Sequence, residues 1–331
     1  MKKNRETYID AVKGLTITLV VLHHVISGTN TALGLPSWFM ELYKLTVPIR
    51  MPLFFLVAGL FAQKSLTLPF KKFVDSKLLY FAYFYILWNT IDVITRATLS
   101  KFTNNKVDII EVFYFPIYPS FALWFLYILF FYFLLAYILR KVDPRIQVLM
   151  VSVVALATQY TIYYDLSVVI RNGIKFLPFF FIGIYYSKSI RNFVETRSSS
   201  AFTLIFLLVY VIIASLVFVG IAEFNNPVYF YPAAFCSILF FLNLFKLLSK
   251  FKVVFLFDFI GKRSLYIYVM HFLPVAAFRV IFNKLFGIEH LGVLILTSTF
   301  CSVCCCIIAF EAFKNIKFVE FLFKRPNWAK A

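Results

Sequence analysis

Charged residues are scarce in this chain of 331 residues. Asp, Glu, Lys and Arg together make up 15% of it, whereas 62% is apolar and 21% aromatic. An ordinary soluble domain has roughly a quarter charged residues. A water-soluble fold of this size cannot bury so large an apolar fraction, so the composition excludes a soluble globular protein.

Acidic residues are the scarcest of the charged types, with 15 Asp and Glu against 33 Lys and Arg, which gives a formal net charge of +18. Such a charge can indicate nucleic-acid binding, but here the basic residues are spread along the chain rather than clustered on one face. We interpret them as topology determinants that also meet anionic lipid headgroups. No nucleic-acid partner is expected.

Cysteine is also rare. Four of the five cysteines lie between residues 301 and 306, within one apolar stretch. Adjacent ligands on one lipid-embedded helix cannot surround a tetrahedral metal, and thiols inside a bilayer are poor candidates for disulfides. We therefore expect small packing residues there and no metal site.

Long apolar runs are what the chain has instead. Runs of about 17 to 25 residues can cross a hydrocarbon core as helices. We predict an all-α polytopic membrane protein with one integral-membrane domain, residues 1–331, and cytoplasmic termini. No small-residue cleavage site follows the first run, so we expect a retained span rather than a signal peptide. The ten predicted spans are approximately 11–28, 46–62, 78–95, 121–139, 146–163, 168–187, 201–221, 228–248, 264–285 and 291–312.

The basic residues provide a check on this topology, because Lys and Arg concentrate in cytoplasmic connections. With the N-terminus inside, 24 of the 33 basic residues fall on the cytoplasmic side. The connections are too short to fold alone, so the functional machinery must lie in or beside the membrane.

Ionisable residues within spans are costly and mark functional candidates. The first span carries Asp10, Lys13, His23 and His24. The eleven residues from Lys13 to His24 make three helical turns plus about 20°, with a rise of about 16 Å, so these two side chains share a face. Asp10 lies within about 40° of that face, whereas His23 points about 100° away.

This stripe suits acyl transfer from a large anionic donor. Lys13 can hold a phosphate as a point charge, and His24, whose imidazole ordinarily titrates near about pH 6.5, can take a proton from an attacking hydroxyl. The alternative is that Asp10 and Lys13 pair near the interface and that the histidines make structural hydrogen bonds.

Polar residues recur in three other spans. Ser264, Tyr268 and His271 lie near one face of the ninth, where His271 is functional or a structural hydrogen-bonding residue. Arg50 in the second span can hold an anionic acceptor or meet lipid headgroups. For Arg171 and Lys175 in the sixth span, we favour interface anchors over inward-facing anion ligands.

The chain resembles the membrane acyltransferase 3 family, in its fucose 4-O-acetylase-like branch. The family signature of an acid, a base three residues later and a histidine after ten more is matched by Asp10, Lys13 and His24. The other matching segments, in order, are 51–55 (MPLFF) with Ala58 and Gly59, 123–126 (LWFL), 178–183 (PFFFIG) and 261–271 (GKRSLYIYVMH).

The sequence departs from the family pattern in four places. Lys13 replaces an arginine that is common there, Arg50 stands where the branch often has histidine, and Ala58 stands where serine is usual. The Arg-x-x-Arg pair that often follows the second span is absent, with Lys71, Lys72 and Lys77 as the nearest equivalents.

The resemblance implies transfer of an acetyl group from acetyl-CoA, as a co-substrate, to a sugar hydroxyl of a bacterial surface polysaccharide or lipid-linked glycan at the inner membrane. It implies no resident cofactor, and homo-oligomers are compatible with it. Three groups of residues are predicted: His24, Asp10 and His271 as catalytic; Lys13, Lys71, Lys72 and Lys77 for the donor; and Arg50, Tyr268 and Trp124 for the acceptor.

Two other functions remain open from the sequence. A transporter or flippase for a lipid-linked glycan can use the same intramembrane charges as a translocation path. A membrane scaffold in a glycan-assembly complex is the non-catalytic alternative, and in that case mutation of His24 leaves the pathway intact.

Overall fold

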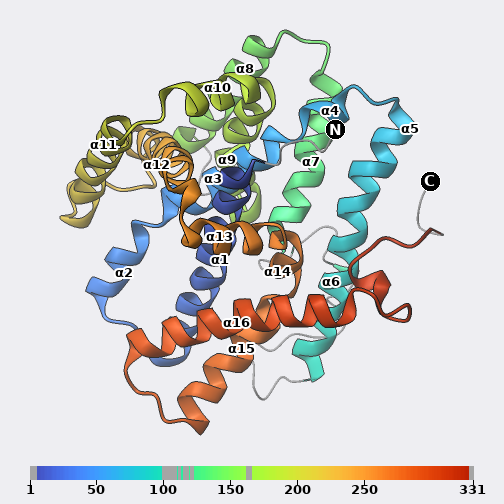
Figure 1. Ribbon diagram of the computed structural model, residues 1–331, viewed down its shortest axis with the longest axis vertical. Coiled ribbons are helices and arrows are strands. Elements are labelled where there is room, and N and C mark those ends of the chain that lie inside the picture. Colours follow the sequence, from blue (N-terminus) through green and yellow to red (C-terminus); the bar gives the residue numbers. More distant parts are fainter. Residues whose placement is uncertain are drawn as a thin grey trace. The chain divides into compact units, whose positions relative to one another are not determined.

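The computed structural model describes residues 6–98, 110, 113–114, 119, 123–161 and 166–327, and this part of the chain is helical, without β-strands. Figure 1 labels its helices. The chain forms two compact units that alternate along the sequence. Unit 1 comprises residues 1–17, 36–67 and 136–264, and unit 2 comprises residues 18–35, 68–135 and 265–331. The first helix, α1 (Thr7–Leu33), contributes its beginning to unit 1 and the remainder to unit 2.

Unit 1 is built around α3 (Val47–Leu60) and α9 (Val168–Tyr185), which pack against each other. The other helices of unit 1 are α2 (Ser37–Lys44), α4 (Gln63–Leu66), α8 (Pro144–Thr161), α10 (Ser187–Arg197), α11 (Ser200–Phe218), α12 (Pro227–Leu247), the 3₁₀ turn η3 (Leu248–Lys250) and α13 (Lys252–Gly261). Of these, α8 packs on α9, and α12 packs on both α3 and α11.

Two glycines allow α3 and α9 to approach closely. A Cβ atom on Gly59 would overlap the carbonyl oxygen of Phe180, and one on Gly183 would overlap that of Leu56. Small residues let helices in membranes come together at backbone distance, where van der Waals packing replaces the hydrophobic effect as the driving force. The small-Gly step at residues 58–59 and the glycine of the Phe-rich segment at 178–183 therefore meet each other in the fold.

Unit 2 combines α-helices with short π-helical and 3₁₀ segments. Its helices besides α1 are α5 (Phe70–Phe73), the π-helix η1 (Val74–Leu78), α6 (Leu79–Thr98), α7 (Trp124–Leu139, of which residues 124–135 belong here), α14 (Ser264–Met270), α15 (Phe272–Val280), the π-helix η4 (Ile281–Leu285), α16 (Leu291–Phe313) and the 3₁₀ turn η5 (Glu320–Leu322). Within it, α15 packs along α16.

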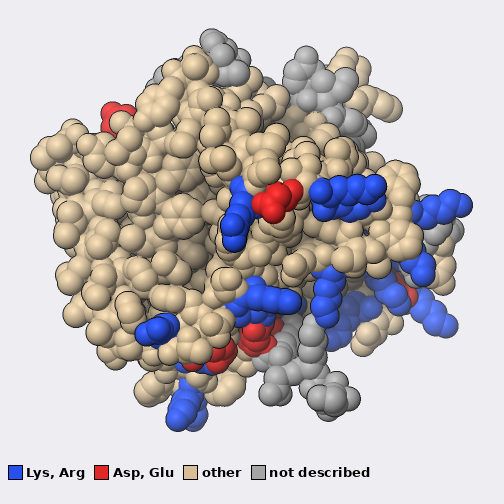
Figure 2. Space-filling model, turned by 90° about the horizontal axis from the view of Figure 1, so that it is seen from above, with Lys and Arg blue, Asp and Glu red and all other residues tan. Residues whose placement is uncertain are grey.

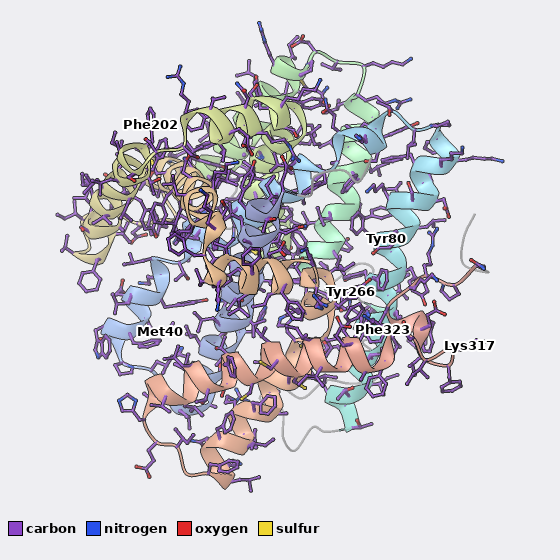
Figure 3. The ribbon with its side chains drawn as sticks, viewed as in Figure 1. Met40, Tyr80, Phe202, Tyr266, Lys317 and Phe323 are labelled. Carbon is purple, nitrogen blue, oxygen red and sulfur yellow. The ribbon has the colours of Figure 1, made fainter. Side chains whose placement is uncertain are left out.

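The segment after α16 is anchored to unit 2 by specific contacts. The indole Nε1 of Trp88 donates to the carbonyl of Leu322 at 3.1 Å. The Phe323 ring packs against Tyr266, with centroids 5.9 Å apart (Figure 3), and Arg325 forms an ion pair with Asp75. These contacts hold the segment against α6 and η1.

The helices confirm a multi-pass membrane protein. Within the described residues, seven helices are long and apolar enough to cross a bilayer, or eight if the bent pair of α14 and α15–η4 is one span. On α11 the large side chains Leu204, Ile205, Leu208 and Ile212 are exposed, as lipid-facing residues must be, since lipid tails are as apolar as leucine.

Two of the ten predicted spans fall outside these eight. The apolar helix α7 has 16 residues, fewer than the roughly 20 that a full crossing needs. The other is α8, which begins at Pro144 and carries Arg145, Gln147 and Gln159. The count of ten, the cytoplasmic termini and the single domain stay predictions.

We expect Gly59→Ala to destabilise the protein through the α3–α9 contact. Replacing a helical glycine with alanine normally stabilises a helix by up to about 1 kcal/mol, but here the added methyl must displace the α9 backbone, and overpacking costs about 1–3 kcal/mol. Thermal unfolding of the detergent-solubilised protein measures the effect.

Gly292→Ala is the matched control, because a Cβ there meets only the His290 ring, at 3.3 Å. Equal unfolding temperatures for the two variants would show that the α3–α9 contact is not the tight one that the structure describes.

Candidate functional site

Three histidines gather in unit 2. The ring centroids of His24, on α1, and His271, between α14 and α15, lie 4.8 Å apart, and His23 contacts His24 with centroids 4.9 Å apart. His271 is fully buried, whereas His23 and His24 are partly exposed. The two spans in which the sequence places candidate histidines therefore bring these side chains into direct contact.

A proline explains why His271 lies at a break in the helix. Pro274 has no N–H to donate to the carbonyl of Met270, and its ring clashes with that carbonyl. The helix axis bends by 59° between α14 and the segment that begins with Phe272. The sequence predicts one continuous span over 264–285, and the bend shows that this span is broken at His271.

The surroundings of His271 fix its tautomer. Its Nδ1 lies 2.6 Å from the carbonyl oxygen of Tyr268. Because a carbonyl oxygen can only accept a hydrogen bond, Nδ1 carries the proton, and Nε2 of the neutral ring has the lone pair. Nε2 is buried and has no hydrogen-bond partner among the described residues.

Tyr268 links this cluster to the first turn of α7. Its hydroxyl oxygen accepts a hydrogen bond from the backbone N–H of Phe125 at 3.1 Å, and the two rings contact each other at 5.4 Å. The first N–H groups of a helix have no partner within the helix, so Tyr268 satisfies one of them. The buried Trp124 is the first residue of the same helix. His24, His271, Tyr268 and Trp124 thus all lie in unit 2, joined through α14 and the start of α7.

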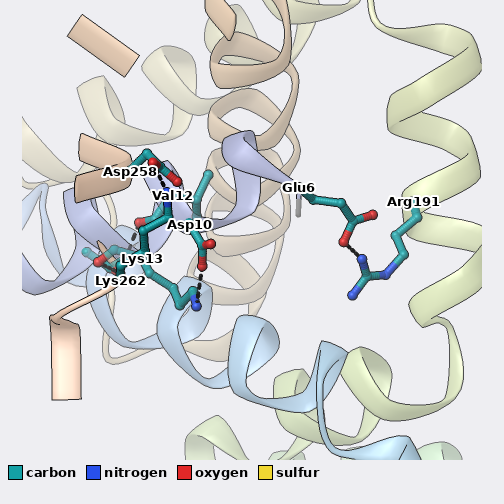
Figure 4. A network of polar contacts seen from close by, with 8 residues as sticks. Glu6, Asp10, Val12, Lys13, Arg191, Asp258 and Lys262 are labelled. Carbon is teal, nitrogen blue, oxygen red and sulfur yellow. Dashed lines mark hydrogen bonds and ion pairs between the residues drawn. The ribbon is translucent and has the colours of Figure 1, made fainter. Parts of the chain in front are cut away.

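The acidic and basic residues of the first span lie in unit 1. Asp10, 3% exposed, holds the Lys13 ammonium at 2.5 Å (Figure 4). Close by on α13, Asp258 pairs with Lys262. Glycines bring the two helices together, because a Cβ on Gly261 would overlap the carbonyl of Asp10. The Asp10–Lys13 pairing that the sequence offers as one alternative is therefore present.

The remaining predicted donor-binding lysines form a separate group. Lys71 and Lys72, on α5, are exposed, and Lys77, on η1, lies over the Phe133 ring at 5.2 Å. In the described part of unit 2, neither Lys71 nor Lys72 makes an ion pair. Other basic groups lie next to acidic ones on the face shown in Figure 2.

Arg50 is buried within unit 1 near the start of α3. Its Nη1 donates to the Tyr43 hydroxyl at 2.9 Å, whereas its Nε has no partner among the described residues. The headgroup-contact alternative requires an exposed side chain, and Arg50 is 8% exposed.

Lys175 corrects a prediction. It is 4% exposed, donates to the carbonyl of Phe224 at 2.9 Å and lies 3.7 Å above the centroid of the Phe230 ring. The interface-anchor interpretation is wrong for Lys175, because a carbonyl and an aromatic face in the interior provide the partners that lipid headgroups would otherwise supply.

A protein-family model described as an acyltransferase domain matches residues 6–311. The chain belongs to this acyltransferase family. The match covers nearly the whole chain, including both the Asp10–Lys13 pair and the histidine cluster. No curated protein and no solved structure matches the chain. The protein is therefore a membrane acyltransferase.

Sequence reasoning missed two arginines of this acyltransferase that make specific contacts. Arg279, 7% exposed, donates to the carbonyl of Gly28, one turn beyond His24 on α1. Arg191 donates to the carbonyl of Leu60 at the end of α3 and pairs with Glu6. Neither lies in a motif. For Arg279 the only signal was a charge inside an apolar segment.

Tyr268→Phe should destabilise the acyltransferase, because it removes the hydroxyl that accepts the hydrogen bond from the N–H of Phe125. Loss of such a hydrogen bond costs about 0.5–1.5 kcal/mol. Thermal unfolding in detergent measures it, with Tyr266→Phe as control, since Tyr266 contributes by stacking on Phe310 with ring centroids 3.9 Å apart. Indistinguishable stabilities would contradict the hydrogen bond.

Proposed function

We propose that this membrane acyltransferase transfers an acetyl group from acetyl-CoA to a sugar hydroxyl of a bacterial surface polysaccharide or a lipid-linked glycan, in the inner membrane. Family membership supports the acyl transfer. The observation that carries the proposal further is the contact between His24 and His271 at 4.8 Å, in a chain with only four histidines.

The histidine pair fits general-base catalysis. His24 is partly exposed and can meet an acceptor, whereas His271 is buried and held by Tyr268. His24 removes the proton from the acceptor hydroxyl as its oxygen attacks the thioester carbonyl. The oxygen–acyl bond forms, the carbon–sulfur bond breaks, and the CoA thiolate leaves and takes up the proton from His24. His271 supports the His24 ring during this proton transfer.

A thioester is already activated, so the reaction needs no Ser-His-Asp arrangement. The chief chemical demand is removal of the hydroxyl proton in a medium of low polarity. Transient acetylation of His24 is the alternative route, and it uses the same side chain as a nucleophile rather than as a base.

The start of α1 suits the donor. The Lys13 ammonium is partly exposed, with 21% of its side chain accessible, and Asp10 holds it in place. Along α1 the rise from Lys13 to His24 is about 16 Å, comparable with an extended pantetheine arm. A donor whose phosphates lie at Lys13 can therefore present its thioester near the depth of His24. The exposed Lys71 and Lys72, with Lys77, add further positive charge on the side predicted to be cytoplasmic.

The acceptor is assigned to Arg50, Tyr268 and Trp124. The buried Nε of Arg50 offers a donor to an anionic or hydroxyl-rich ligand, and aromatic faces such as Trp124 and Tyr268 are suited to sugar rings. Acetyl-CoA is a co-substrate, so no resident cofactor is invoked, and membrane lipids surround the protein. A homo-oligomer is compatible with this scheme.

His24→Ala should abolish acetylation while leaving the protein abundant in the membrane. Loss of a general base lowers the rate by about 10²- to 10⁴-fold. The measurement is NMR of purified surface polysaccharide from cells that lack the gene and carry wild type or variant, together with transfer of label from acetyl-CoA by purified protein.

His290→Ala is the matched control, because His290 is exposed and lies at the start of α16, where its ring accepts from the N–H of Val293. Full activity of His24→Ala would make His24 structural. Unchanged acetylation with impaired glycan export would favour the transporter alternative. A pathway that is unaffected in the His24 variant, while purified wild type transfers no label from acetyl-CoA, would favour a scaffold.

A further inference from the structure

Two cations lie over a half-exposed aromatic ring in unit 1. The Phe61 side chain follows the end of α3 and is 50% exposed. The Nζ atom of Lys13 lies 5.0 Å from the centroid of this ring, and the Cζ atom of Arg191 lies 5.3 Å from the same centroid. Lys13 comes from α1 and Arg191 from α10, so three separate segments build one group, which we call the Phe61 rim.

The rim is held by contacts that fix Arg191. Its Nη2 donates to the carbonyl of Leu60 at 3.4 Å, and its Nε donates to the Ser187 hydroxyl at 3.2 Å. That hydroxyl donates in turn to the same carbonyl at 3.2 Å. The close approach of α3 and α9 at Gly59 and Gly183 brings these groups together. Arg191 is therefore a positioned side chain rather than a freely moving surface arginine.

The charges of the rim are paired but accessible. Glu6 pairs with Arg191, and Asp10 pairs with Lys13; the accessible fractions of the Arg191, Glu6 and Lys13 side chains are 24%, 28% and 21%. Partial burial removes part of the hydration of the Arg191 guanidinium and so lowers its pKa from the ordinary value. A partly exposed ion pair contributes little to stability, so a stronger anion can displace Glu6.

We propose that Phe61 and Arg191, together with Lys13, bind the adenosine 3′,5′-bisphosphate end of the CoA donor. This inference rests on the proposed function and extends it to residues with no assigned role. The Phe61 face stacks on the adenine base, as aromatic side chains do in nucleotide-binding proteins. The planar guanidinium of Arg191 forms paired hydrogen bonds with a phosphate, and Lys13 neutralises a second phosphate.

The composition of the rim favours a nucleotide over a lipid phosphate. A lipid headgroup needs positive charge but gains nothing from an exposed phenyl ring next to two cations. A nucleotide uses both parts, because its base has a π-face and its phosphates are charged. The predicted cytoplasmic N-terminus also places the start of α1, which carries Lys13, on the side where CoA is found.

Donor truncation tests this assignment. With acetyl-CoA as donor, Phe61→Ala should raise KM about 5- to 100-fold, the range that follows from removal of a base-stacking aromatic. Arg191→Gln should raise it at least about tenfold, as expected for a lost charge-assisted hydrogen bond. With S-acetylpantetheine, which lacks the nucleotide, each variant should match wild type, and kcat should stay unchanged with both donors.

Matched variants separate stacking from packing. Phe61→Trp keeps an aromatic face and should keep a low KM for acetyl-CoA, whereas Phe61→Leu keeps apolar bulk and should not. Phe251→Ala is the control, because this ring in unit 1 is 60% exposed and has no assigned role. A KM for acetyl-CoA that is unchanged in Phe61→Ala, or that rises equally with S-acetylpantetheine, overturns the inference.

Wild-type protein provides a test that does not depend on how Arg191 variants fold. Adenosine 3′,5′-bisphosphate should inhibit competitively against acetyl-CoA and should raise the unfolding temperature, and both effects should weaken in Phe61→Ala. Absence of both effects in wild type overturns the inference while acetyl transfer itself persists. A wild-type protein that transfers no acetyl from acetyl-CoA would instead refute the proposed function.

Discussion

Close backbone contact between helices is the constraint on which the polar groups of unit 1 depend. A Cβ on Gly14 would overlap the carbonyl of Phe257, and one on Gly261 would overlap the carbonyl of Asp10. The beginning of α1 therefore lies directly against α13. This contact sets the Asp10–Lys13 pair beside the Asp258–Lys262 pair, as Figure 4 shows. In both pairs the carboxylate is buried and the lysine is partly exposed, and a buried carboxylate is costly unless it is paired.

In unit 2 the position of His271 depends on a break in a helix rather than on a close contact between helices. Pro274 interrupts the hydrogen bonding at Met270, and the break leaves His271 in the interior, against His24. Non-helical backbone at membrane depth persists only where protein groups satisfy it. Tyr268 makes two of the hydrogen bonds in this region. Its carbonyl accepts from Nδ1 of His271, and its hydroxyl accepts from the backbone N–H of Phe125. The residues around the proposed base thus also maintain the local fold.

The sequence predicts part of this arrangement and leaves the rest undetermined. Helical periodicity places Lys13 and His24 on one face of α1, and apolar runs predict the helices, because both depend on neighbours within one segment. The contact of His24 with His271 joins residues 247 positions apart in the sequence, and no local pattern encodes it. The bend was also missed although Pro274 is visible, because membrane helices often tolerate proline without a break.

The burial of Lys175 and the position of Arg191 show why the environment of an isolated charged residue cannot be predicted from its neighbours in the sequence. Lys175 and Arg171 are one turn apart, so spacing alone gives no reason to bury one of them. The deciding partners of Lys175 are the Phe224 carbonyl and the Phe230 ring, which belong to a segment some fifty residues away. The same holds for Arg191, whose position is set by its hydrogen bond to the carbonyl of Leu60 at the end of α3.

The distribution of polar groups suits acyl transfer from a charged, soluble donor to an acceptor that meets the enzyme at the membrane. The phosphates of such a donor stay hydrated at the membrane surface, so the cations that bind them need accessible side chains, as Lys13 and Arg191 have. Proton removal from the acceptor hydroxyl needs a base that is neutral before it acts, since a buried charge is costly. Imidazole is the side chain that meets this requirement near neutral pH. A carboxylate at the depth of His24 would be charged while it waits for substrate. Among the described residues, the buried carboxylates Asp10, Asp92 and Asp258 instead lie beside basic side chains.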